Sequence, residues 1–178
     1  MGRQPGRKLI VGCRPKASCL AGRLSSNVRP QNPPSSIFPV MTQTQFFEWL
    51  GSPLHNVRWS WGAVRNDGVV FLRIWQDETT RHNGLRYMRV TNHGHFAGNP
   101  ENLGYRERLE HLKLIGSGAP SYMVMCEADP AKLPEREILD FNEDYVFRGG
   151  SLVTIAGDSW LELGQRIAAR TVRLPPQA

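Results

Sequence analysis

Histidine and cationic side chains gather in one window of the sequence, between Arg81 and Lys113. The window holds four of the chain's five histidines, and six Lys or Arg against three Glu. Its net charge is +3, whereas the rest of residues 41–178 carries −4. Because guanidinium and ammonium groups bind phosphate oxygens, the window predicts a surface that contacts nucleic acid. A solvated charged face is the alternative.

Eight residues of this window are candidates for the contact surface. Exposed cationic side chains suit phosphate contacts, and aromatic or imidazole side chains suit a base or its pocket. Arg108 falls on the apolar stripe of the helix expected there, so it either pairs with a carboxylate (Asp77 or Glu78) or reaches a ligand. The predicted phosphate contacts are Arg86, Arg89, Arg106 and Lys113, and the predicted base or pocket contacts are His93, His95, Tyr105 and Arg108.

Two tryptophans form a second candidate feature. Trp59 and Trp61 lie two residues apart on one face of a strand expected over 56–64, and Trp75 lies on the next expected strand. Aromatic rings can stack on a base that has left its helix. Burial in the core is the alternative, because a Trp side chain covers a large apolar area. Trp59 and Trp61 are therefore candidates for base stacking.

His93, His95 and His111 are the candidates for a metal site in a metal-dependent hydrolase or nuclease. Two of them lie two residues apart on an expected loop, and no Cys or acidic motif at ligand spacing accompanies them. We therefore predict no bound metal. The chain also lacks a GxGxxG or a phosphate-binding lysine loop, so we predict no nucleotide cofactor. A nucleic-acid-binding module without catalysis is the leading hypothesis, with the enzyme and a protein-interaction domain as alternatives.

Capping and periodicity predict the elements that position these residues. Thr42 and Gln45 have the spacing of a helix capping box, and Gly51 ends that helix. Asn99 and Ser159 are predicted to begin two further helices, over 100–115 and 160–170. Together the elements predict an α+β fold, with a mixed or antiparallel curled sheet of about six strands flanked by about three helices. The expected strands cover 56–64, 69–75, 85–90, 120–128, 136–141 and 151–156.

Residues 1–40 differ in composition from the rest of the chain. They hold seven Lys or Arg and no acidic residue, so they carry +7 while residues 41–178 carry −1. The prolines of "RPQNPPSSIFP" exclude a helix or a central strand there. We predict a disordered basic leader over 1–40 and a single α+β domain over 41–178. A transit peptide and a nucleic-acid-binding arm are the alternatives for the leader.

The composition also predicts a compartment. No apolar run approaches the roughly 18 residues that a membrane-spanning helix needs. The three cysteines form neither a disulfide framework nor a zinc-binding pattern. We therefore expect a cytoplasmic protein that has no membrane partner.

Four segments resemble a bacterial domain associated with HNH-type restriction endonucleases and related DNA-defence proteins. The segments are "WSWGAV", "VVFLRIWQDE", "LGYRERLEHL" and "FRGG", and the resemblance covers roughly Phe46 to Ile167. It implies a specificity or DNA-sensing module whose nuclease lies elsewhere, for example on a partner protein, or has been lost. Recognition of a modified base is part of the leading hypothesis for this module. The nuclease motif is absent from this sequence, so the resemblance implies no catalytic residue.

Removal of residues 1–40 is expected to leave the fold intact, because the domain begins with its own helix cap. A chain that starts at Met41 should melt within about 2 °C of the full chain, since tail changes rarely exceed about 0.5 kcal/mol. Thermal melts followed by circular dichroism test this. A truncated chain that aggregates, or melts more than about 5 °C lower, would contradict it.

Overall fold

A computed structural model describes residues 41–174 except 97, 100 and 133–135. Residues 1–40 lie outside the described part, so the leader and its boundary stay predictions. None of the described helices is long and apolar enough to cross a membrane. The elements in chain order are α1 (Gln43–Trp49), β1 (Gly62–Val64), β2 (Val70–Trp75), β3 (Thr79–His82), β4 (Leu85–Arg89), α2 (His93–Phe96), α3 (Leu103–Gly116), β5 (Ser121–Ala128), a 3-10 turn (Pro130–Lys132), β6 (Ile138–Phe141), β7 (Tyr145–Ile155), β8 (Asp158–Ala168) and α4 (Ala169–Val172).

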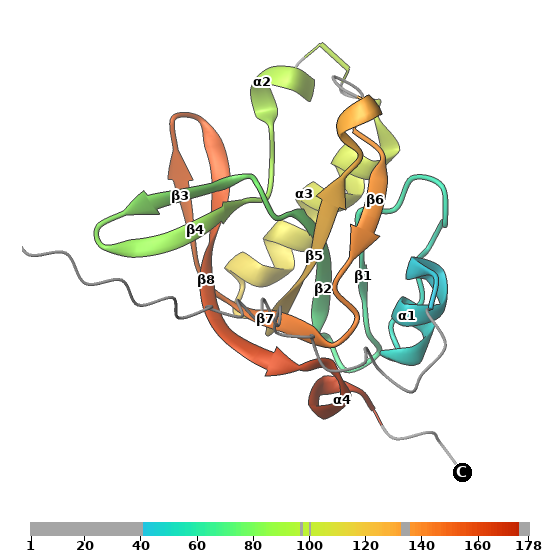
Figure 1. Ribbon diagram of the computed structural model, residues 1–178. Coiled ribbons are helices and arrows are strands. Elements are labelled where there is room, and N and C mark those ends of the chain that lie inside the picture. The colour runs from blue at the N-terminus through green and yellow to red at the C-terminus, as the bar shows by residue number, and fades with distance from the viewer. Residues whose placement is uncertain (1–40, 97, 100, 133–135, 175–178) are drawn as a thin grey trace, which may run out of the picture. The chain divides into compact units, whose positions relative to one another are not determined.

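The strands form one sheet in the order β1-β2-β5-β7-β8-β4-β3, with β6 beside β5. β2 and β5 are parallel, and the other strand pairs are antiparallel. The sheet curls back until β2 contacts β4, but among the described residues no strand pairing closes it. Figure 1 shows this curl, with the long strand β8 bending around the sheet. The predicted α+β class is confirmed, with a mixed sheet of eight strands.

Alternate residues of β2 enter two separate cores, because successive side chains of a strand point to opposite faces. Leu72 and Ile74 pack with Leu112 of α3. Phe71, which lies between them in sequence, packs with Phe46 of α1. The helices α1 and α3 therefore cover opposite faces of the central strands. This packing fixes α3, which carries several of the candidate site residues.

The predicted cap of α1 is confirmed. The Gln45 amide N–H donates to Thr42 Oγ1 at 3.3 Å, and the Thr42 amide N–H donates to Gln45 Oε1 at 2.9 Å. Gly51 follows the helix with a φ of 77°, a conformation that glycine adopts without steric cost. Local signals were sufficient here because both bonds join residues three apart.

The strand predicted over 56–64 was wrong for most of its length. Only its last three residues, Gly62–Val64, form β1. The residues before them form a turn, in which the Ser60 amide N–H donates to the Asn56 carbonyl at 2.9 Å and the Arg58 amide N–H donates to Asn56 Oδ1 at 2.9 Å. Asparagine side chains commonly hold turns in this way. Trp59 and Trp61 therefore do not lie on one face of a strand, although their spacing suggested it.

Two features near the candidate site also differ from the prediction. The segment Thr79–His82, which is not among the expected strands, is strand β3, joined to β4 by a two-residue turn with φ of 51° at Asn83 and 80° at Gly84. Positive φ at both positions is the geometry of a type I′ hairpin turn. The long helix begins later than predicted: Asn102, not Asn99, accepts the capping bond, from the Tyr105 amide N–H at 2.9 Å.

The helix predicted over 160–170 was wrong, and most of that segment is strand β8. It pairs with β7 along most of its length and with β4 on its other side. Ala156 and Gly157, with φ of 49° and 88°, form the two-residue turn that starts the hairpin. The amide N–H of Ser159 donates to Thr91 Oγ1 at 2.8 Å, so Ser159 caps no helix. Pairing with two neighbours thus overrides the local helix signal.

Candidate functional site

A cleft of about 760 Å³ lies where the ends of β2 and β4 approach α2 and the start of β6. Its volume falls within the roughly 300–1,000 Å³ typical of small-molecule sites. Aromatic rings and guanidinium groups make up much of its lining. The rings belong to Trp61, Trp75 and Phe96, and the guanidinium groups to Arg58, Arg73, Arg89, Arg108 and Arg136.

Arg108 spans the gap where the curled sheet does not close. Its side chain is buried, and it donates three hydrogen bonds to backbone carbonyls: Nη1 to Val90 at 3.0 Å, and Nη2 to Trp61 at 2.6 Å and to Arg73 at 2.8 Å. Val90 follows β4, whereas Trp61 precedes β1 and Arg73 lies in β2, so the other two acceptors are on the β1–β2 side of the gap. Burial, with the charge of Arg73 second, lowers the pKa of Arg108 to about 10.

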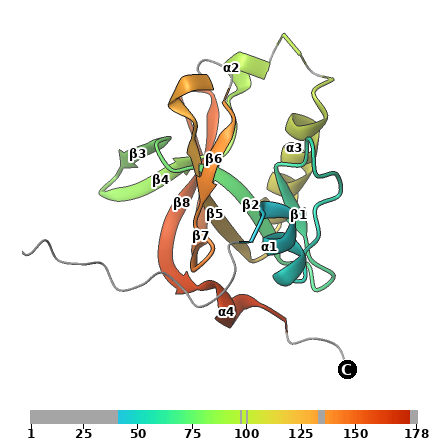
Figure 2. The same ribbon diagram turned by 45° about the vertical axis from the view of Figure 1, so that its right-hand side comes forward.

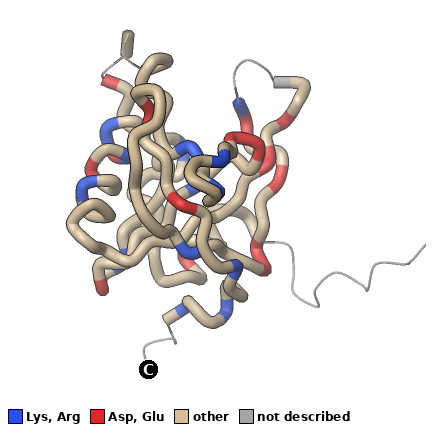
Figure 3. The backbone as a smooth tube through the Cα atoms, turned by 90° about the vertical axis from the view of Figure 1, so that its left-hand side faces the viewer, with Lys and Arg blue, Asp and Glu red and all other residues tan. Residues whose placement is uncertain are grey.

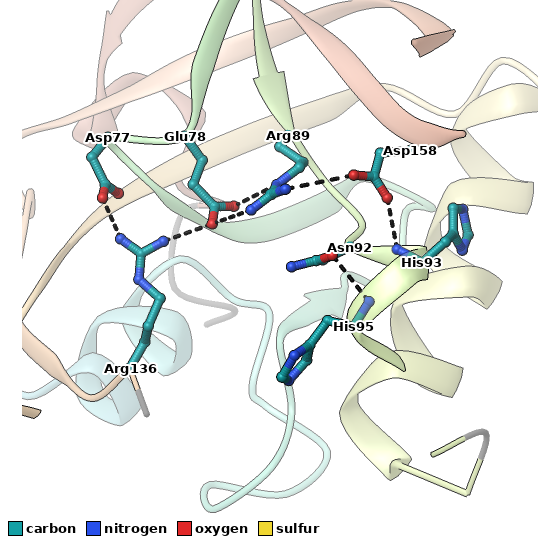
Figure 4. Close-up of polar contacts among 8 residues, drawn as sticks. All are labelled: Asp77, Glu78, Arg89, Asn92, His93, His95, Arg136 and Asp158. Atoms are coloured by element: carbon teal, nitrogen blue, oxygen red, sulfur yellow. Dashed lines mark hydrogen bonds and ion pairs between the residues drawn. The ribbon is translucent and has the colours of Figure 1, made fainter. Parts of the chain in front are cut away.

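The carboxylates that were predicted to pair with this buried arginine bind other arginines, so that prediction was wrong. Glu78 Oε1 accepts from Arg89 Nη2 and from Arg136 Nη1, each at 2.7 Å. Arg136 also pairs with Asp77, and Arg89 Nη1 lies 3.5 Å from Asp158 Oδ2. The hydrogen bond with Glu78 raises the pKa of Arg89. Figure 4 shows this chain of ion pairs, which joins β4 to β8 and to the segment before β6.

The remaining arginines give the cleft a positive interior. The lining residues include five Arg and two Glu, which is a net charge of +3, and it falls to +1 when Asp77 and Asp158, paired with Arg136 and Arg89, are counted. Glu78 is already shared by two arginines, whereas Arg73 and Arg108 form no ion pair among the described residues. Arg73 Nη1 donates to the neutral amide of Gln43 at 2.8 Å, and burial lowers the pKa of Arg73. A cleft of this charge favours anionic ligands.

Trp61 is held in the cleft by the first turns of α3. Its backbone N–H donates to Glu107 Oε2 at 2.8 Å. A side chain at Gly104 would collide with the indole ring, so the glycine allows the ring to lie against the helix. On the other side the ring lies 5.0 Å from the ring of Phe96, between centroids. The indole is therefore positioned by contacts on two elements.

His93 and Tyr105 support α2 and do not line the cleft. The backbone N–H of His93 donates to Asp158 Oδ1 at 2.7 Å, and its Nδ1 contacts the Tyr105 hydroxyl. The Tyr105 ring stacks on Phe96 with centroids 5.0 Å apart. Both residues therefore position Phe96, which does line the cleft. His93 and Tyr105 therefore lie behind Phe96, and the prediction that they contact the ligand directly is not supported by their positions.

The other sequence-predicted residues divide into two groups. Some line the cleft and others lie outside it, where two of the cations form exposed ion pairs with Glu. Exposed ion pairs contribute at most about 1 kcal/mol, so these cations can exchange a carboxylate for a phosphate. Figure 3 shows basic and acidic positions interspersed along the described backbone. Arg89, His95, Arg108 and Trp61 line the cleft; Arg86, Arg106, Lys113 and Trp59 do not, and of these Arg106 pairs with Glu101 and Lys113 with Glu110.

The three candidate metal ligands do not come together. His111 is buried beside β1, and its Nδ1 has no hydrogen-bond partner in the described part of the chain. Burial, with the charge of Arg108 second, lowers the pKa of His111 to about 4. His95 is exposed on α2, while His93 contacts Tyr105. Among the described residues no group of three or more His, Cys, Asp or Glu side chains has the arrangement to hold a metal ion.

Sequence reasoning missed several residues of the cleft. Arg73 could have been predicted most readily, because a lone charge within the apolar run "VVFLRIW" indicates that the strand passes a site or a partner. Arg136 covers the Trp75 ring, with its guanidinium carbon 4.6 Å from the centroid. Nothing local in the sequence points to that contact. Cys126 also lines the cleft, but burial raises the pKa of its thiol to about 11, which keeps it protonated.

No family model matches the chain, and neither the curated proteins nor the solved structures that were compared contain a match to it. The assignment of the site therefore depends on its own geometry. The resemblance to HNH-associated domains stays an expectation.

Proposed function

We propose that the domain binds nucleic acid and holds one base in the cleft, without catalysis of its own. The observation that carries this proposal is the cleft lining, where three aromatic rings and five arginines meet. Stacking on an aromatic ring stabilises a bound base by about 1–3 kcal/mol, and arginine binds both base edges and phosphates. The net positive charge of the lining adds attraction for the phosphate backbone.

The walls of the cleft support a further part of the proposal, which is sensitivity to base modification. Trp61 and Phe96 form one wall, and Trp75 lies with Arg136 over its ring. A substituent on the bound base would contact these rings, so it would change the contact area and the affinity. The exposed cations Arg86, Arg106 and Lys113 remain proposed phosphate contacts outside the cleft.

Replacement of Trp61 or Trp75 by alanine is expected to weaken nucleic-acid binding about 10- to 100-fold, because each change removes a stacking surface. Trp59→Ala is the matched control: Trp59 is half-buried and lies outside the cleft lining. Fluorescence-anisotropy titrations with labelled oligonucleotides, carrying cytosine or a methylated or hydroxymethylated cytosine, measure the effect. The two cleft variants should also lose discrimination between these bases.

Thermal melts of the same variants separate lost binding from lost folding. If Trp59→Ala weakens binding as much as Trp61→Ala does, the base does not stack in the cleft. If the unaltered chain binds no oligonucleotide at low salt, with modified bases included, the nucleic-acid function is wrong. The protein-interaction hypothesis would then take its place.

A further inference from the structure

The tip of the β3–β4 hairpin leaves the sheet as a bare two-stranded ribbon. β8 pairs with β4 only at Tyr87, Met88 and Arg89, so no third strand of the described chain lies beside residues 81–86. All six of these residues are exposed. Figures 1 and 2 both show the hairpin projecting beyond the neighbouring strands.

The ribbon carries charge that the described part of the chain does not neutralise. Arg81 and Arg86 are directly opposite each other in the strand register. Like charges at opposed positions destabilise a strand pair, and a two-stranded ribbon is only marginally stable alone. Neither arginine forms an ion pair with a described residue, and residues 81–86 include no acidic side chain. The ribbon therefore presents two uncompensated guanidinium groups to solvent.

The shape and charge of the ribbon fit one kind of nucleic acid. The major groove of B-form DNA is about 12 Å wide and admits a two-stranded β-ribbon, whose cations can reach the phosphates on either side. The major groove of A-form RNA is too narrow and deep for side chains to read. We propose that residues 81–86 enter the major groove of double-stranded DNA, which makes duplex DNA the partner of this domain.

This inference rests on the proposed function, because ribbon and cleft must act on the same DNA. Arg86 and Arg89 are three residues apart on β4, which is about 10 Å at roughly 3.4 Å per residue. That span corresponds to about three base pairs, so one short DNA segment can reach both the ribbon and the cleft that Arg89 lines. The odd separation also points the two side chains to opposite faces of β4. The ribbon therefore adds a contact without filling the cleft.

The test compares charge reversal at the ribbon with charge reversal elsewhere in the full chain. The ribbon variant combines Arg81→Glu with Arg86→Glu. The control combines Arg148→Glu with Arg170→Glu, which are exposed positions on β7 and α4 and change the net charge equally. Each protein is titrated with duplex DNA, duplex RNA of the same sequence and single-stranded DNA, over a series of salt concentrations. Thermal melts confirm that each variant folds.

We expect the unaltered chain to bind duplex DNA more tightly than duplex RNA. The ribbon variant should bind duplex DNA about 10- to 100-fold more weakly, and its log–log salt slope should be smaller by about 2, since each phosphate contact contributes about 0.9. Its binding to single-stranded DNA should resemble that of the control. If the charge reversal impairs folding, the pair Arg81→Gln and Arg86→Gln removes the same two charges without adding repulsion.

Three results would overturn the inference, and they differ from failure of the proposed function. If the ribbon and control variants bind duplex DNA equally, the ribbon makes no contact, although the cleft still binds a base. Equal loss on duplex RNA would exclude a B-form groove. Equal loss on single-stranded DNA would exclude a duplex partner. Absence of all binding by the unaltered chain would instead contradict the function itself.

Discussion

Replacement of Arg108 by methionine is expected to lower the free energy of unfolding by about 4 kcal/mol, because buried carbonyls lose their donor. Val90 follows β4, whereas Trp61 and Arg73 lie on the paired β1–β2 side, and among the described residues no strand pairing joins β4 to that side. Trp61 also accepts from the Arg73 amide N–H, so its carbonyl keeps one partner. The main cost falls on the Val90 and Arg73 carbonyls. Arg108→Lys keeps the charge but lacks the fork that reaches three acceptors, so it should destabilise nearly as much.

Urea unfolding measures this effect, and α3 supplies a matched control. Arg106 lies on the same helix with an exposed side chain paired to Glu101, so Arg106→Ala should change the free energy of unfolding by less than about 0.5 kcal/mol. An Arg108→Met protein as stable as the unaltered chain would show that Arg108 does not hold the gap in the sheet. Because Arg108 also lines the cleft, the binding affinity of its variants must be interpreted together with their measured stability.

The burial of Arg108 was within reach of sequence reasoning, but its partners were not. The helical stripe placed the side chain toward the core, where an arginine needs compensation. A carboxylate is the usual partner, and Asp77 and Glu78 were plausible ones. The observed acceptors are backbone carbonyls, which every residue has, so no residue type marks them. Only the curl of the sheet brings Val90 near Trp61.

Elements were predictable where their determinants are local. The capping box of α1 and the buried strand β5 depend on neighbouring residues, and both predictions were confirmed. β8 depends instead on partners that are distant in sequence, because it lies between β7 and β4. The Ala156–Gly157 turn before it and Gly164 within it are local features that disfavour a helix. The capping pattern at Ser159 favours a helix, but pairing with β7 and β4 overrides it.

The cleft combines residues that local patterns predicted with residues that only distant pairing brings together. Trp61 and Arg89 were identified from residue type, but the lining also includes Phe96, which packs on Trp61, and Arg136, which shares Glu78 with Arg89. The ion pairs from Asp77 through Arg136 to Asp158 fix these segments relative to one another (Figure 4). A network of this kind has no sequence spacing of its own. It becomes visible only when the strands are ordered in the sheet.

Acidification is expected to destabilise the domain through His111, which the fold holds in its neutral form. Burial, and then the charge of Arg108, lower the pKa of His111 from 6.5 to about 4. As the pH falls below 6.5, the unfolded chain binds a proton that the folded chain does not, so the free energy of unfolding decreases. The decrease continues until the folded-state pKa near 4 and then levels off. The gap between the two pKa values corresponds to roughly 3 kcal/mol.

His111→Gln should remove this part of the pH dependence, since glutamine does not titrate. The measurement is urea unfolding at about pH 7 and about pH 4, for the unaltered chain and the variant. Carboxylates titrate in the same range, so the prediction concerns the difference: the variant should lose about 3 kcal/mol less than the unaltered chain. His95→Gln, which replaces an exposed histidine, should retain the full loss. Equal losses for His111→Gln and His95→Gln would mean that His111 accepts its proton in the folded chain as readily as in the unfolded one.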